Sequence, residues 1–91
     1  MASSPAPSRA AKVLVAEDDT DTLGLLSLWL TRRGHGVIAT TNGNEALRLV
    51  HAERPDIIIL DWVMPGEQGH EVCRKIKADP ETAGIPVVML T

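Results

Sequence analysis

The sequence predicts an α/β domain, in which a doubly wound parallel sheet lies between two layers of helices. Short apolar runs alternate with longer amphipathic stretches from Lys12 onward, which is typical of repeated strand and helix units. The runs at 13–16, 57–60 and 87–90 are continuously apolar, as expected for strands that are covered on both faces. A weaker fourth candidate strand spans 37–39.

The first predicted helix covers residues 20–33. Asp19 stands directly before it and is expected to cap its first turn. Gly34 follows as a stop signal. The apolar face is formed by three leucines at helical spacing, and two neighbouring residues widen it: Leu23, Leu26 and Leu30, with Leu25 and Trp29.

Two further helices complete the alternation. One is expected to begin after Asn42, which resembles the start of a capping box, and to end before Pro55. The other is expected over about residues 68–77. Right-handed crossovers then favour the sheet order 2-1-3-4, with the first helix on one face and the other two on the opposite face.

Composition limits the function. The chain has 91 residues and a net charge of −3, and it has no basic stripe of the kind that direct nucleic-acid binding requires. Cys73 is the only cysteine, so neither an internal disulfide nor a zinc site is expected, which fits a reducing cytoplasm. No apolar stretch approaches the roughly 18 residues of a spanning helix, so no membrane association is expected. We expect residues 1–10 to be a disordered tail and residues 11–91 to form the domain.

Acidic residues follow two of the predicted strands. Glu17, Asp18 and Asp19 come after the first apolar run, and Asp61 ends the third strand. The carboxyl ends of parallel strands meet at one edge, and ligands bind where the strand order reverses, which is between these two strands. Two carboxylates about 4 Å apart repel by roughly 4 kcal/mol at an effective dielectric of 20, so the cluster favours a cation. Oxygen ligands suit Mg²⁺, and Asp61 can then attack phosphorus to form an acyl phosphate.

Three ordered segments make the chain similar to the receiver domain of response regulators in bacterial two-component signalling, which has a flavodoxin-like fold. The matching segments are 13–19, 61–69 and 85–91. The resemblance implies that the chain takes a phosphoryl group from a sensor histidine kinase or a phosphotransfer protein, with Mg²⁺ as cofactor. It describes a signalling phosphoacceptor that promotes its own phosphorylation and dephosphorylation, and not an enzyme acting on other substrates.

The resemblance also implies a role for each site residue. Asp61 corresponds to the phosphoacceptor, and Asp18 to a direct metal ligand. Glu17 corresponds to the acid that reaches the metal through water, and Val63 to a ligand through its carbonyl. Thr91 corresponds to the switch hydroxyl.

Family members carry a lysine at the end of a fifth strand, which the resemblance sets beyond Thr91, together with the last two helices. We therefore expect the domain to be incomplete at its C-terminus. The fourth strand is expected to be an open apolar edge, through which a second copy of the chain can pair.

Two other classes of protein remain open. One is a receiver-like interaction module that keeps the acids and does not signal by phosphorylation. The other is an aspartate-nucleophile phosphatase, which commonly has a second acid two residues after the nucleophile, where this chain has Val63. Phosphoryl incorporation and its lifetime distinguish the three.

Overall fold

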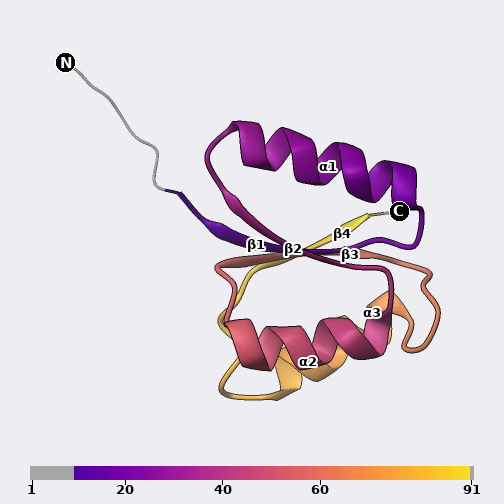
Figure 1. The fold of residues 1–91 in the computed structure, drawn as a ribbon. Coiled ribbons are helices and arrows are strands. Elements are labelled where there is room, and N and C mark those ends of the chain that lie inside the picture. The colour runs from indigo at the N-terminus through magenta and orange to yellow at the C-terminus, as the bar shows by residue number, and fades with distance from the viewer. Residues whose placement is uncertain (1–9, 91) are drawn as a thin grey trace.

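A computed structural model describes residues 10–90. Strands and helices alternate as the sequence predicts (Figure 1): β1 (Lys12–Ala16), α1 (Thr20–Arg32), β2 (Gly36–Thr40), α2 (Gly43–Glu53), β3 (Ile57–Asp61), α3 (Gly69–Ala78) and β4 (Val87–Leu90). The expected tail falls, apart from Ala10, outside the described residues, as does Thr91. In the stretch from 10 to 90, no helix combines the length and the apolar character needed to cross a bilayer.

All neighbouring strands are parallel, and their order is β2-β1-β3-β4, which confirms the predicted order. Figure 1 shows α1 alone on one face of the sheet and α2 and α3 together on the other. This arrangement follows from right-handed crossovers to either side of β1. The order of the strands reverses between β1 and β3, so the carboxyl ends of these two strands form the expected binding edge.

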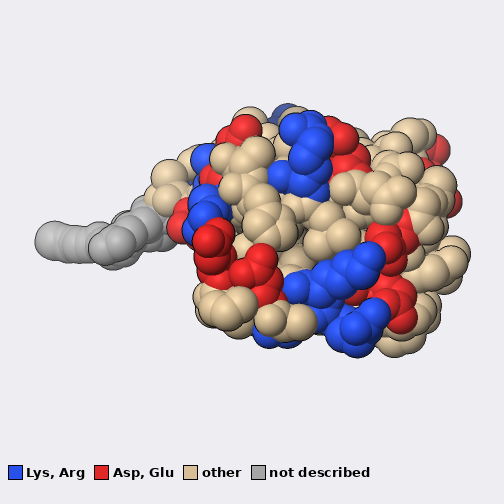
Figure 2. Space-filling model, turned by 90° about the horizontal axis from the view of Figure 1, so that it is seen from below, with Lys and Arg blue, Asp and Glu red and all other residues tan. Residues whose placement is uncertain are grey.

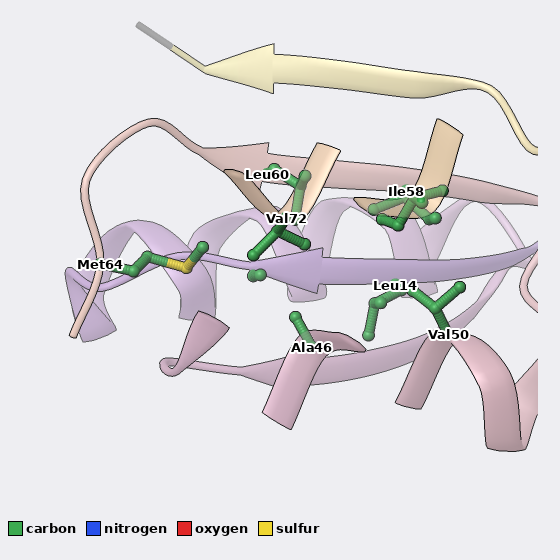
Figure 3. Close-up of a cluster of buried hydrophobic side chains, with 9 residues drawn as sticks. Leu14, Ala46, Val50, Ile58, Leu60, Met64 and Val72 are labelled. Atoms are coloured by element: carbon green, nitrogen blue, oxygen red, sulfur yellow. The ribbon is translucent and has the colours of Figure 1, made fainter. Parts of the chain in front are cut away.

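The larger apolar core lies between the sheet and the α2 and α3 helices. Alternate residues of β1 and β3 point into it, since side chains in a strand alternate between faces. Figure 3 shows the cluster closed at one end by Met64, from the loop after β3. Its buried members are Leu14, Ala16, Ala46, Val50, Ile58, Leu60, Met64, Val72 and Ile76.

A smaller cluster lies beneath α1, where Val13, Val15 and Leu30 are buried. Leu25 and Trp29, which widen the apolar face of this helix in the sequence, lie outside its buried stripe. Leu25 is 69% exposed and Trp29 is 55% exposed. Because α1 packs against the sheet on one side only, it buries a narrow stripe, and residues on its flank and outer surface meet solvent.

Side chains cap the first two helices as predicted. Asp19 accepts hydrogen bonds from the backbone N of Asp21 at 3.4 Å and from Oγ1 of Thr22 at 2.6 Å. Asn42 accepts hydrogen bonds from the backbone N of Asn44 at 2.8 Å and of Glu45 at 3.2 Å. Each cap satisfies amide groups that have no partner inside the helix.

The outer face of α2 and α3 carries acidic and basic side chains in alternation (Figure 2), among them the ion pairs Arg48–Glu45 and Lys75–Glu67. On the same side of the molecule His51 of α2 binds Asp79, which follows α3, with Nε2 and Oδ2 2.8 Å apart. The hydrogen bond with Asp79 raises the pKa of His51, and the pKa of Asp79 is lowered in turn by His51.

This pair predicts a pH-dependent contribution to stability. Because the pKa of His51 is raised, protonated His51 contributes fully to the free energy of unfolding below its ordinary pKa of 6.5. This contribution is lost as the pH rises through the raised pKa. The lowered pKa of Asp79 means that its contribution is present above 3.8 and is lost as the pH falls through the lowered pKa. We expect His51→Gln to destabilise the fold modestly at about pH 5 and to have little effect at about pH 9.

Urea unfolding at the two pH values, with Asp79→Asn as the matched variant, measures this effect. Asp79→Asn removes the carboxylate of the same pair. It should therefore also lower the free energy of unfolding more at about pH 5 than at about pH 9. An equal loss of stability for His51→Gln at both values would contradict the assignment.

Candidate functional site

The acids predicted at the sheet edge come from two adjacent strands. Ala16 of β1 pairs with Leu60 of β3, so Glu17, which follows β1, and Asp61, the last residue of β3, lie at the same level of the sheet edge. Glu17 is 7% exposed and is held by its backbone, whose N donates to the carbonyl of Thr40 at 3.0 Å. Asp61 is partly buried. The register of the two strands therefore brings these two carboxyl groups together.

The carboxyl group of Asp61 lies close enough to Glu17 to influence the pKa of Glu17. Burial raises the pKa of Glu17, and Asp61 raises it further through a hydrogen bond and through charge repulsion. The hydrogen bond from the backbone N of Asp19 to Oε2 of Glu17, 3.0 Å long, acts in the opposite direction. A buried acid whose pKa is raised in this way by a neighbouring carboxyl group marks an edge where positive charge is favoured.

The other two acids of the cluster have different positions. Asp19 turns away to cap α1, as predicted, whereas Asp18 is exposed beside the edge. Within residues 10–90, none of the ion pairs involves Glu17, Asp18 or Asp61. Over the same range, no three His, Cys, Asp or Glu side chains come together as ligands of one metal ion.

The donors at this edge fit a hard cation. Glu17, Asp18 and Asp61 offer carboxylate oxygens without a competing ion pair in the described chain, and Val63 lies in the loop directly after Asp61. Oxygen ligands from carboxylates, a backbone carbonyl and water are the set that Mg²⁺ prefers, and Mg²⁺ commonly keeps several waters. A magnesium ion with one or two protein carboxylates does not need three ligating side chains.

The loop that follows Asp61 is held at several points. The backbone N of Trp62 donates to the carbonyl of Leu90 at 3.2 Å, and the backbone N of Gly69 donates to the carbonyl of Trp62 at 2.9 Å. The backbone N of Gly43 donates to the carbonyl of Pro65 at 3.1 Å. Met64 is 3% exposed and anchors the loop in the core. The segment after the acidic residue is thus fixed to β4, α2 and α3.

Two glycines that sequence reasoning missed permit this close packing. A Cβ atom on Gly69 would lie 1.9 Å from the backbone O of Asp61, and one on Gly43 would lie 2.0 Å from the backbone O of Glu67. Both residues open a helix, where glycine has no propensity advantage. A glycine in that position is a signal for close backbone approach.

Trp62 is 47% exposed and stacks on His70 at the start of α3, with ring centroids 5.3 Å apart. It therefore packs next to the site while it remains in contact with solvent. Thr91, the predicted switch hydroxyl, lies outside the described residues.

An open parallel sheet with acids on adjacent strands at its switch point, followed by a tightly held loop, defines the receiver class of α/β proteins. Residues 13–91 match the family described as "Response regulator receiver domain", and the chain belongs to that family.

The chain is similar in sequence to proteins from two bacteria. The transcriptional regulatory protein AfsQ1 of Streptomyces coelicolor is 42% identical over 79 residues, which cover 87% of this chain and 34% of AfsQ1. The protein PilH of Pseudomonas aeruginosa is 35% identical over 81 residues, which cover 89% of this chain and 67% of PilH. The chain therefore spans about a third of AfsQ1 and about two thirds of PilH.

A similar solved structure is the receiver domain of the sensor histidine kinase PA1611 from Pseudomonas aeruginosa PAO1, which has a magnesium ion coordinated in its active site cleft. The TM-score is 0.86 and the sequence identity 25%, and the match covers 91% of this chain and 68% of that chain.

The glycine contacts predict opposite effects of the same substitution at two helical positions. Gly69→Ala forces a methyl group against the backbone of Asp61, and we expect it to lower the free energy of unfolding by about 3 kcal/mol. Gly24→Ala, in the middle of α1, meets no atom within 4 Å, and we expect it to raise the free energy of unfolding by up to about 1 kcal/mol. Urea denaturation measures the free energy of unfolding of each variant. Similar changes in the two variants would disprove the close contact of Gly69 with the backbone of Asp61.

Proposed function

We propose that this chain is a phosphoacceptor and that Asp61 receives the phosphoryl group. The observation that carries the proposal is that the register of β1 and β3 sets Asp61 near Glu17 at the switch point of the sheet, in a chain that belongs to the receiver family. The donor in this proposal is the phosphohistidine of a sensor kinase or phosphotransfer protein, or a small acyl phosphate. A carboxylate oxygen of Asp61 forms the bond to phosphorus while the bond from phosphorus to the donor breaks, and the leaving group keeps that electron pair.

The acids beside Asp61 prepare this reaction in two ways. Negative charge at Glu17 and Asp18 favours a divalent cation, and we propose that Glu17, Asp18, Asp61 and the carbonyl of Val63 hold Mg²⁺, directly or through water. The ion would offset the negative charge that gathers as the phosphate approaches. The fixed loop after Asp61 keeps the acceptor oxygen in place, so less ordering is needed during the reaction.

Thr91 serves as the switch hydroxyl, and residues 11–91 form the receiver unit. Phosphorylation and loss of the phosphoryl group both depend on Mg²⁺ and on the chain's own acids. The proposed partner is a sensor histidine kinase or a phosphotransfer protein, and the proposed location of the reaction is the cytoplasm.

We expect Asp61→Asn to abolish acid-labile phosphorylation by acetyl phosphate, because the amide cannot act as the acceptor. Asp19→Asn is the matched control: it keeps a side chain that can cap α1, and it should leave incorporation within about twofold of the original chain. Incorporation of labelled phosphate measures both variants. Labelled phosphate that remains on Asp61→Asn would show that another residue is the acceptor. Absence of label on the unsubstituted chain would favour a receiver-like interaction module that does not signal by phosphorylation.

Binding of Mg²⁺ should change the fluorescence of Trp62, which adjoins Asp61. The chain has two tryptophans, and Trp29 lies on the outer flank of α1, so Trp29→Phe isolates the reporter at the site. We expect a saturable change with Mg²⁺ in Trp29→Phe, no saturable change when Asp18→Asn is added, and none in Trp62→Phe. Unchanged emission and unchanged amide shifts near Asp61 in the folded Trp29→Phe protein would exclude the metal site.

A further inference from the structure

The turn that joins β2 to α2 contacts both segments that carry candidate site residues. At one end of the turn, the carbonyl of Thr40 accepts a hydrogen bond from the backbone N of Glu17 at 3.0 Å. At the other end, the backbone N of Gly43 donates to the carbonyl of Pro65, in the loop after Asp61, at 3.1 Å. This turn therefore connects the segment after β1 with the segment after β3.

Asn42 fixes the shape of the turn. Its backbone N donates to Oγ1 of Thr40 at 3.2 Å. Its side-chain Oδ1 accepts hydrogen bonds from the backbone N of Asn44 at 2.8 Å and of Glu45 at 3.2 Å. Asn42 thereby sets the direction in which α2 begins, and with it the direction of the N–H group of Gly43.

The amide group of Asn42 also lies against the loop itself. Gly66 has a φ of 77°, which is in the left-handed region that favours glycine. A Cβ atom on Gly66 would lie 3.0 Å from Oδ1 and 3.2 Å from Nδ2 of Asn42, and 3.0 Å from Nδ2 of Asn44. The space beside Gly66 is therefore filled by the side chains that begin α2.

This contact supports the part of the loop that follows Val63, whose carbonyl is a proposed ligand of Mg²⁺. Met64 is 3% exposed and anchors the loop in the core, but a single buried side chain fixes a point of the backbone and not the orientation of the neighbouring peptide groups. Contacts on both sides of Met64 fix that orientation. The backbone N of Trp62 supplies the contact before it, and Pro65 and Gly66, which rest on the turn, supply the contact after it.

Capping alone does not require asparagine at this position. Serine and aspartate cap helices about as well. The contact with Gly66 is different, because the side chain of serine is shorter than that of asparagine and has no amide group to place there. The capping of α2 and the support of the loop can therefore be separated by substitution.

We propose that Asn42 is a positioning residue for phosphoryl transfer, and that it sets the place of the loop after Asp61 relative to Glu17. The inference rests on the proposed function, since it takes Asp61 as the acceptor. Asn42 acts through Gly43 and Gly66, and not on the phosphoryl group directly. A reaction that depends on placement loses rate when the segment beside the acceptor shifts by even about 1 Å.

Asn42→Ser keeps the cap of α2 and removes the contact with Gly66. The backbone N–H of Gly69 bonds to the carbonyl of Trp62 across the loop, and we expect it to exchange with solvent about tenfold faster in this variant. NMR of the chain without Mg²⁺ measures this exchange. We also expect the initial rate of phosphorylation by acetyl phosphate, at saturating Mg²⁺, to fall about tenfold. The midpoint of urea unfolding should change little, because the cap remains.

Asn42→Asp is the conservative variant, since aspartate caps a helix and has the length of asparagine. The exchange of the Gly69 amide and the rate of phosphorylation should both stay within about twofold of the unsubstituted chain. A role of Asn42 in stability alone would not separate the serine variant from the aspartate variant in this way.

Ala52→Gly is the matched control. Ala52 is exposed and lies at the opposite end of α2 from Gly43, and glycine weakens a helix at such a position. This variant should lower the midpoint of urea unfolding and leave the rate of phosphorylation within about twofold of the unsubstituted chain.

A fall in both the rate and the protection of the Gly69 amide in Asn42→Ser, with recovery in Asn42→Asp, supports the proposal. Original values of both in Asn42→Ser overturn it, and an equal loss of rate in Ala52→Gly reduces Asn42 to a helix cap. Normal phosphorylation that is insensitive to Asn42 overturns this role alone. A chain that takes up no phosphoryl group overturns the proposed function and the role of Asn42 in the reaction together, and the exchange of the Gly69 amide then shows whether Asn42 holds the loop.

Discussion

The pairing of β1 with β3 is the constraint on which the candidate site depends. Residues 13–16 pair in register with residues 57–60, and this pairing alone brings Glu17 and Asp61 to one level at the sheet edge. A slip of one residue would turn every side chain of a strand to the opposite face. Both faces of β1 are buried, by Leu14 in the larger cluster and by Val13 in the smaller one, so such a slip would disturb two cores together.

Crowding of carboxylates at this edge works against folding, and the site persists because other contacts fix its backbone. The loop after Asp61 bonds to β4, α2 and α3, and Met64 is buried in the core. The contacts at Gly43 and Gly69 are so close that a larger residue would displace the loop or the helix. The acid at the end of β3 is thereby presented in a defined position whether or not its charge is balanced, which is what a preorganised acceptor requires.

The sequence determines more of the fold than of the site. Continuous apolar runs identified the strands, and residues with a short polar side chain identified the helix starts at Asp19 and Asn42. These signals are local. The contacts that hold the loop after β3 join segments far apart in the chain. A glycine at a helix start indicates that another backbone segment comes close, but the sequence does not identify that segment. The exposure of Leu25 and Trp29 on α1 has a related reason: periodicity shows which residues share an apolar face, and only the packed neighbours decide how much of that face is covered.

The two sides of the sheet are covered unequally in residues 10–90. On one side α2 and α3 enclose the larger cluster; on the other, α1 alone covers β1 and β2. Val88 of β4, which pairs with Ile59, remains 45% exposed, while Leu25 and Leu28 face solvent on α1 itself. Burial of exposed apolar surface is favourable by about 25 cal/mol per Å². A surface that packs over these residues in the folded chain therefore also stabilises the fold.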